Sequence, residues 1–187
     1  MIAERYLVID LEATCDDDPQ RRQVPVGQCE IIEIGAVMVE REGWRVIDEF
    51  DIFVRPVRHP RLTAFCTRLT SITQAEVDAA PTFPEAIDRF KAWLRQHEGF
   101  AFGSWGNYDR LQILQDCAYH RIAYPIAAPH VNIKTEFSAR QRVKKLGLGQ
   151  AIERAGLTFT GTPHRGVDDA RNAARLLPYA FGDARVP

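Results

Sequence analysis

Cysteine is sparse in this chain and follows no recognisable spacing. The 187 residues include four cysteines, which form no C-x-x-C pair and no zinc-ligand pattern. We therefore expect reduced thiols, which are typical of an intracellular compartment, in place of a disulfide framework.

Long apolar runs are also missing. No stretch approaches the ~20 apolar residues that a membrane-spanning helix needs, and the first apolar run ends at Asp10 and Glu12, too early for a secretory signal. A surplus of one charge sign is lacking as well. The formal net charge is −1, so no global basic field draws the chain to nucleic acid or to a membrane. The sequence predicts a soluble, cytoplasmic protein that does not engage a membrane.

The length and composition suit one globular domain spanning residues 1–187. Hydrophobic residues make up 45% of the chain and charged residues 26%. A domain of this size buries roughly 70% of its unfolded surface. The sequence holds no internal repeat, low-complexity tract or linker that would divide the chain, so we expect a single domain.

Apolar periodicity and turn residues divide the chain into strands and helices. Three strand-like segments come first, and helical segments then alternate with two more strands. The expected strands are residues 6–9, 30–40, 44–54, 100–105 and 130–133, and the expected helices are residues 62–69, 73–77, 82–98, 106–121, 148–155 and 166–179. This order predicts an α/β fold of three αβα layers, in which helices flank a mixed five-stranded sheet.

Two carboxylates interrupt the first strand. Residues 6–9 are large and apolar or β-branched, as in a buried central strand, and Asp10 and Glu12 follow them. Side chains two residues apart share one face of a strand, so these two acids lie side by side, within reach of one hard cation. The alternative is a frayed strand end with two ordinary solvated acids.

Two later segments add polar residues at helix starts. Asp109 follows a predicted strand and opens a helix, where ligands collect in open α/β sheets, although a helix-capping role is the simpler interpretation. His164 lies in a loop bounded by proline and glycine, and Asp168 and Asp169 occupy the first turn of the last helix. Neighbouring helix positions are about 100° apart, so one of these two acids can face a site. Taken alone, His164 is more typical of a surface residue than of a base.

These motifs, in this order, resemble those of the DEDDh 3′→5′ exonucleases, the DnaQ-like branch of the ribonuclease H-like fold. Asp10 and Glu12 match the family's first motif, D-x-E. Asp109 matches the second motif, an Asp shortly after a strand end. His164 and Asp169 match the third motif, H-x-x-x-x-D.

The resemblance extends to the Eri-type branch, which includes the histone-mRNA 3′ exonuclease and KapD-like bacterial proteins. Residues 10–15, 65–74 and 161–172 carry it, and together with the motifs it covers nearly the whole chain. One departure is Asn107-Tyr108 before the second motif, where relatives often have Asp-Trp. We expect this difference to affect substrate stacking more than catalysis.

The residue types and the resemblance together predict a two-metal phosphodiesterase. Four carboxylates with open positions suit two Mg²⁺ or Mn²⁺ ions about 3.5–4 Å apart. An imidazole titrates near neutral pH, so His164 is suited to accept the proton of the attacking water. The expected product is a nucleoside 5′-monophosphate released from a 3′ end. The expected metal ligands are Asp10, Glu12, Asp109 and Asp169.

Single-stranded 3′ ends are the expected partner, with RNA favoured over DNA because of the resemblance; protein partners are not predicted. The resemblance implies backbone contacts from Leu11, Ala13 and Thr14, and places His164 and Asn107 beside the substrate.

Two aromatic residues and one basic segment are further candidates for binding the strand. Phe65 and Trp105 could stack on terminal bases; core packing is favoured for Trp105 and stacking for Phe65. The basic residues could hold upstream phosphates or could form a solvated surface, and the sequence leaves both open. These basic residues are Arg140, Arg142, Lys144 and Lys145.

Two alternatives stay open. The first is a DNA-directed or dual-specificity exonuclease. The second is a non-catalytic regulatory protein on the same fold, although a protein that had lost catalysis would be expected to lose a carboxylate that is costly to bury.

Overall fold

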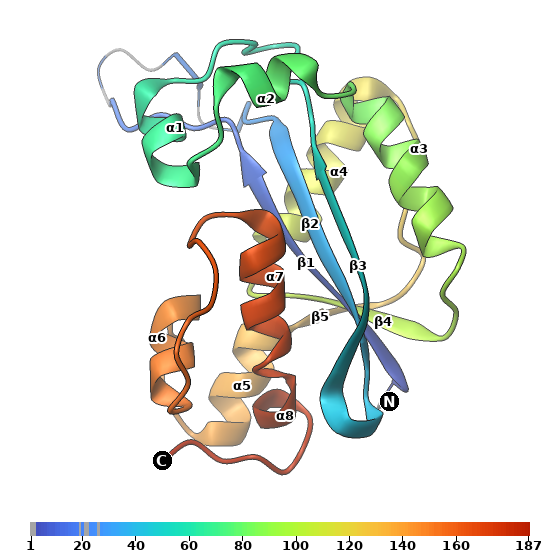
Figure 1. Ribbon diagram of the computed structural model, residues 1–187, viewed down its shortest axis with the longest axis vertical. Helices are drawn as coiled ribbons and strands as arrows, with labels where there is room; N and C mark the ends of the chain where they lie inside the picture. Colours follow the sequence, from blue (N-terminus) through green and yellow to red (C-terminus); the bar gives the residue numbers. More distant parts are fainter. Residues whose placement is uncertain (1–2, 19, 21–22, 26) are drawn as a thin grey trace.

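The computed structural model describes residues 3–18, 20, 23–25 and 27–187. Five strands form one sheet in the order β3-β2-β1-β4-β5 (Figure 1). β1 pairs antiparallel with β2 and parallel with β4, so the predicted mixed sheet is confirmed. The strands are β1 (Arg5–Ala13), β2 (Ile31–Glu40), β3 (Arg45–Phe53), β4 (Phe100–Ser104) and β5 (His130–Asn132).

Helices cover both faces of this sheet, as predicted. The helices are α1 (Ala64–Thr70), α2 (Gln74–Ala79), α3 (Phe83–Leu94), α4 (Tyr108–His120), α5 (Ile133–Gln141), α6 (Leu148–Arg154), α7 (Gly166–Ala174) and α8 (Leu177–Ala180), with a short 3₁₀ turn η1 (Glu42–Trp44) between β2 and β3. One core cluster joins α3 and α4 to the sheet, and a second joins α5, α6, α7 and α8 to the opposite face (Figure 1).

The alternation of side chains along β1 positions the site. Leu7, Ile9 and Leu11 pack into the core beneath α3 and α4, whereas Tyr6 and Val8 pack into the core beneath α7. Asp10 and Glu12 continue the second set, because residues two apart share a face. The two acids therefore lie on the α7 side of a strand that is central in the sheet.

Local signals explain most helix boundaries. Glu85 accepts hydrogen bonds from the backbone N–H and the hydroxyl of Thr82, both at 2.7 Å, so Thr82 caps α3 at the residue where the predicted helix begins. The predicted last helix is instead two helices that break after Ala174. Pro178 lies four residues further on, and a proline both lacks an N–H and clashes with the carbonyl four residues back.

One helix, α5, is absent from the sequence interpretation. Within it Ile133, Phe137 and Ser138 are buried, too few apolar positions to give a visible stripe. Its cap is local, since Asn132 Oδ1 accepts a hydrogen bond from the backbone N–H of Thr135 at 3.0 Å. Within the described ranges, no helix combines the length and apolar character needed to cross a bilayer.

Candidate active site

The first two acids lie together on β1, and both have raised pKa values. Burial raises the pKa of Asp10 well above its usual value, and the nearby carboxylates of Asp109, Asp169 and Glu12 raise it further. Burial also raises the pKa of Glu12 to about 8, with Asp169 adding to the effect. The two side chains are therefore part of one group of acids that repel one another when ionised.

Asp109 joins this group from the first turn of α4. Its side chain is buried, and Oδ1 accepts a hydrogen bond from the backbone N–H of Leu11 at 3.1 Å. This bond crosses from α4 to β1 between Asp10 and Glu12, so Asp109 does more than cap its own helix. Burial raises its pKa to about 6, while hydrogen bonds from its own backbone N–H and that of Leu11 act in the opposite direction.

Of the two acids at the start of α7, Asp169 faces the site. Asp169 Oδ2 accepts a hydrogen bond from the backbone N–H of His164 at 3.2 Å, and burial raises its pKa to about 6. Asp168 instead accepts a hydrogen bond from the backbone N–H of Thr162 at 2.9 Å and pairs with Arg171 at 2.8 Å. The expectation that one of these acids faces the site agrees with this geometry.

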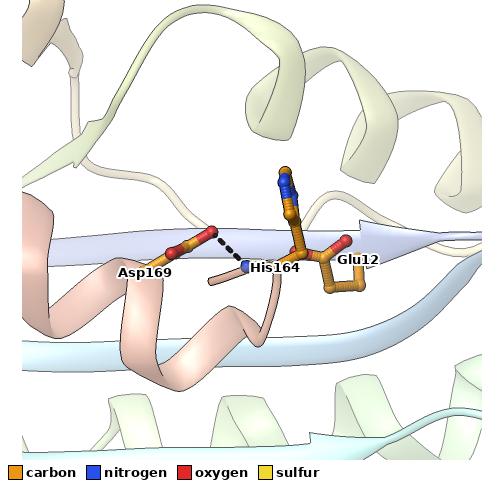
Figure 2. A group of neighbouring side chains, drawn as sticks. All are labelled: Glu12, His164 and Asp169. Carbon is orange, nitrogen blue, oxygen red and sulfur yellow. Dashed lines mark hydrogen bonds between the residues drawn. The ribbon is translucent and has the colours of Figure 1, made fainter. Parts of the chain in front are cut away.

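His164 lies in the loop that leads into α7. Its side chain is exposed, and its backbone has the left-handed conformation, with φ 61°. One nitrogen of His164 and one carboxylate oxygen each of Glu12 and Asp169 lie within 4.8 Å of one another. Figure 2 shows these three side chains gathered over β1. The loop thus brings an imidazole beside the acids.

The residues present fit divalent cations. Carboxylate oxygens are the ligands that Mg²⁺ and Mn²⁺ prefer, and the four acids come from β1, α4 and α7. Each of the four has a pKa raised by burial, and neighbouring carboxylates raise those of Asp10 and Glu12 further. Cations between these groups would offset both the burial and the repulsion.

The two aromatic candidates have different surroundings. Trp105 is buried in the core cluster under α5; its indole N–H donates to the carbonyl of Leu146 at 3.1 Å, and its ring meets Phe137 edge-on at 5.6 Å. This is the packing role that the sequence favoured for Trp105, and it leaves the ring little surface for a base. Phe65 is half-buried on α1 and keeps part of its surface free.

The other proposed contact residues divide into buried side chains and one exposed amide. The side chains of Leu11, Ala13 and Thr14 are buried, so they can offer a ligand backbone atoms more readily than side chains. Asn107 is exposed, and its Oδ1 accepts a hydrogen bond from Asn132 Nδ2 at 3.0 Å. The basic residues at positions 140, 142, 144 and 145 are also exposed.

Sequence reasoning overlooked a further buried acid beside this group, Glu33 on β2. It lies directly opposite Glu12 in the antiparallel register and has no exposed surface. Its partner is Arg165, whose Nε lies 3.2 Å from Glu33 Oε2. The available signal was an acid inside an otherwise apolar strand, since an uncompensated charge is not buried there without a partner.

Comparisons with known proteins assign the chain to a family. The exonuclease family model matches residues 7–177. The chain is 30% identical over 202 residues to the 3′-5′ exonuclease eri1 of Schizosaccharomyces pombe, a match covering 92% of this chain and 67% of that protein. It is 32% identical over 178 residues to 3′-5′ exoribonuclease 1 of Homo sapiens, covering 90% of this chain and 50% of that protein.

Structural comparison gives the same result. The nuclease domain of 3′hExo, described as a DEDDh family member bound to rAMP, superposes with a TM-score of 0.84 at 29% identity, covering 99% of this chain and 96% of that chain. The chain spans between half and two thirds of the length of the two curated relatives above. The acids, the histidine and these similarities together show that the chain belongs to the exonuclease family, in its Eri-type DEDDh branch.

Proposed function

We propose that the chain is a metal-dependent 3′→5′ exoribonuclease that releases nucleoside 5′-monophosphates. The observation that carries this proposal is the meeting of Glu12, Asp169 and His164 within 4.8 Å, with Asp10 and Asp109 completing the acid group. The helices α4 and α7 bring Asp109 and Asp169 to the acids on β1, and the loop before α7 brings His164. A group of buried acids beside an accessible imidazole suits phosphodiester hydrolysis.

In this mechanism, Asp10, Glu12, Asp109 and Asp169 would hold two Mg²⁺ or Mn²⁺ ions. The bound ions would supply Lewis acidity and lower the pKa of a coordinated water. The chain itself contributes orientation and proton transfer. Asp109 fixes the backbone of β1 through its bond with the Leu11 N–H. The exposed His164 imidazole accepts the proton of the attacking water beside Glu12 and Asp169.

RNA is the substrate class that we propose. The human and Schizosaccharomyces pombe relatives are named as 3′-5′ exonucleases, the human one as an exoribonuclease, and one solved neighbour concerns recognition of the 3′ end of a histone mRNA stem-loop. We propose that the backbone of residues 11–14 contacts the terminal nucleotide. The exposed amide of Asn107 and the partly exposed ring of Phe65 would lie beside the bound RNA strand.

Digestion of matched oligonucleotides tests this function. Single-stranded and duplex RNA and DNA, labelled at the 5′ end, would be incubated with Mg²⁺, with Mn²⁺ and with a chelator. We expect a ladder that shortens from the 3′ end of single-stranded RNA, 5′-monophosphate products, and no reaction with chelator. Asp10→Asn is the matched control and should be inactive. Products bearing 3′-phosphates, or activity that survives chelation, would contradict the proposal, and faster digestion of DNA would favour the DNA-directed alternative.

The role of the basic segment is tested by binding. Arg140 also forms an ion pair with Asp183 at 3.4 Å, which already reduces its availability to a phosphate. If the segment holds the strand, neutralising Arg142, Lys144 and Lys145 should reduce the salt dependence of RNA binding by about one unit of slope per lost contact. An unchanged slope would assign these residues to the solvated surface.

We retain a cytoplasmic location as a prediction that cell fractionation tests.

A further inference from the structure

Glu33 is a buried carboxylate that accepts several hydrogen bonds from the loop leading into α7, and the Asp51 side chain on β3 is a further hydrogen-bonded neighbour. Its Oε2 accepts a hydrogen bond from the backbone N–H of Gly166 at 3.0 Å. Arg165 donates from Nε to both carboxylate oxygens, at 3.2 and 3.3 Å, and from Nη2 to Oε1 at 3.3 Å. Because these donors engage both oxygens and the guanidinium neutralises the charge, Glu33 is satisfied without a metal, although it lies opposite Glu12.

Arg165 is fixed from a second direction as well. Its guanidinium lies over the ring of Phe53 at the end of β3, 5.0 Å from the ring centroid. The side chain is about three-quarters buried between β2, β3 and the start of α7. A planar guanidinium with a forked carboxylate partner and an aromatic face beneath it has little freedom to rotate.

The residue that precedes Arg165 is His164, and its conformation requires support. The left-handed φ of 61° is uncommon for a residue other than glycine and persists where the surroundings hold it. The backbone bonds from His164 to Asp169 and from Thr162 to Asp168 tie this loop to its own helix. The bonds from Arg165 and Gly166 to Glu33 tie the same loop to the sheet that carries Glu12.

We propose that the Glu33–Arg165 pair is a positioning device that sets the location of His164 relative to the acids on β1. This inference rests on the proposed exonuclease function. Glu33 lies directly across the sheet from Glu12, and Arg165 is the residue after His164. The ion pair between Glu33 and Arg165 therefore links the strand beside Glu12 to the loop that carries His164. Neither Glu33 nor Arg165 touches the reacting atoms in this scheme.

Substitution of the arginine separates positioning from general stability. Arg165→Ala removes the guanidinium contact with both oxygens of Glu33 and leaves the four proposed metal-binding acids unchanged. We expect kcat to fall about tenfold or more, as when the support of a catalytic group is lost, with little change in KM. Free guanidinium ion added to Arg165→Ala should restore part of the lost kcat. The matched control is Glu49→Gln, which weakens a different ion pair between α7 and the sheet, that with Arg171, leaves the Arg171–Asp168 pair in place and should retain the wild-type kcat.

Two measurements do not depend on activity. In metal-free protein, the amide hydrogens of the loop at residues 162–166 should exchange faster in Arg165→Ala than in wild type or Glu49→Gln. Calorimetric titration with Mn²⁺ should give similar affinities for wild type and Arg165→Ala, because the carboxylates remain. Should Arg165→Ala fold poorly, Glu33→Gln keeps an acceptor for the Gly166 N–H and removes the charge, and the same losses of kcat and of exchange protection are expected.

The outcomes distinguish this inference from the proposed function. A wild-type kcat in Arg165→Ala, or exchange in the loop equal to that of wild type, would overturn the positioning role. A fall in kcat that guanidinium does not restore, accompanied by weaker Mn²⁺ binding, would also overturn it, because it would indicate general disruption of the site. If wild type itself has no exonuclease activity, the proposed function fails, and the exchange and Mn²⁺ measurements still decide whether the pair holds the loop.

Discussion

The four acids of the site are costly to ionise in the folded protein when no cation is present. Burial raises the pKa of all four, and for Asp10 and Glu12 the neighbouring acids raise it further. The same groups would become favourable when a divalent ion lies between them. At the scale of single residues, stability and activity should therefore respond in opposite directions to the loss of one acid.

Glu12→Gln tests that opposition. Removing one charge from the buried group should stabilise the chelated protein at pH 8 by on the order of 1–3 kcal/mol, which raises the melting temperature by several degrees. The same change should abolish the stabilisation that Mn²⁺ gives and the nuclease activity. Thermal unfolding with chelator and with Mn²⁺ provides the measurement. A lower melting temperature in chelator would show that the acids do not repel one another as described.

His164→Ala tests whether His164 acts as a general base or as a metal ligand. The imidazole lies close enough to Glu12 and Asp169 for either role. As a general base, its removal should lower kcat by about 10²–10⁴-fold and leave Mn²⁺ affinity unchanged. Single-turnover kinetics and calorimetry on the same preparation decide the matter. Full activity with bound metal would refute the base assignment, whereas a large loss of affinity would identify His164 as a ligand.

Individual residues also show how far sequence reasoning reaches. The D-x-E spacing alone shows that Asp10 and Glu12 share one face of a strand. The helix period shows that only one of Asp168 and Asp169 can face the site. The pairing of Glu33 with Arg165 joins residues 132 apart, and no local period reports such a contact. The packing of Trp105 against Phe137 and Leu146 likewise depends on α5 and the segment after it, which the sequence interpretation did not resolve.

At the scale of elements, the close approach of α7 to the sheet determines the site. A Cβ added to Gly35 on β2 would lie 2.0 Å from the backbone of Gly166 and Val167, so helix and strand touch through backbone atoms. A Cβ added to Gly166 would lie 2.9 Å from the carbonyl oxygen of Asp10. The absence of side chains at this contact allows Asp169 to reach the acids on β1.

Gly35→Ala should therefore displace α7 and the acid that it carries. We expect a loss of about 1–3 kcal/mol in the free energy of unfolding, as for other overpacked cores, together with weaker Mn²⁺ binding. Gly149→Ala, near the start of α6, is the matched control. A Cβ added there would have nothing within 4 Å, and the backbone lies outside the left-handed region, so alanine should leave stability unchanged or increase it by up to about 1 kcal/mol. Chemical denaturation compares them, and equal stabilities would contradict the close-contact interpretation.

The boundaries of elements were predictable where the signal was local. Strands β1 to β4 and α3 carry apolar runs or a capping pattern within a few residues. The helix α5 lacks such a signal, because it is mostly polar and is held against the core by the buried side chains of Ile133 and Phe137. The break between α7 and α8 was visible in principle, since Pro178 cannot continue a helix, but the small apolar residues around it favoured one long helix.

At the scale of the whole molecule, net charge hides an uneven distribution. The chain carries a formal charge of −1, yet buried acids concentrate on one face of β1 and exposed basic residues lie after α5. Fold class and sheet composition followed from the order of segments and motifs, and the role of the four acids as metal ligands stays a prediction. That residues 1–187 form a single domain stays a prediction.

The response of stability to pH follows from the raised pKa values. Glu12 has a folded pKa of about 8, and unfolding lowers it toward the ordinary value near 4.3. The folded state therefore holds more protons between these values, and its stability falls as pH rises through this window. The difference in melting temperature between chelated Glu12→Gln and wild type should widen from about pH 4.5 to about pH 8 and then stay constant. A difference that is constant or narrows across this range would contradict the raised pKa.

The distribution of the acids along the chain has a consequence for protein synthesis. Asp10 and Glu12 leave the ribosome before α7, which brings Asp169 and follows more than 150 residues later. Domains fold as units as the chain emerges. A nascent chain that ends before α7 has an incomplete acid group and an uncovered face of β1. The nascent chain should thus stay inert toward the messenger from which it is translated until α7 has been synthesised.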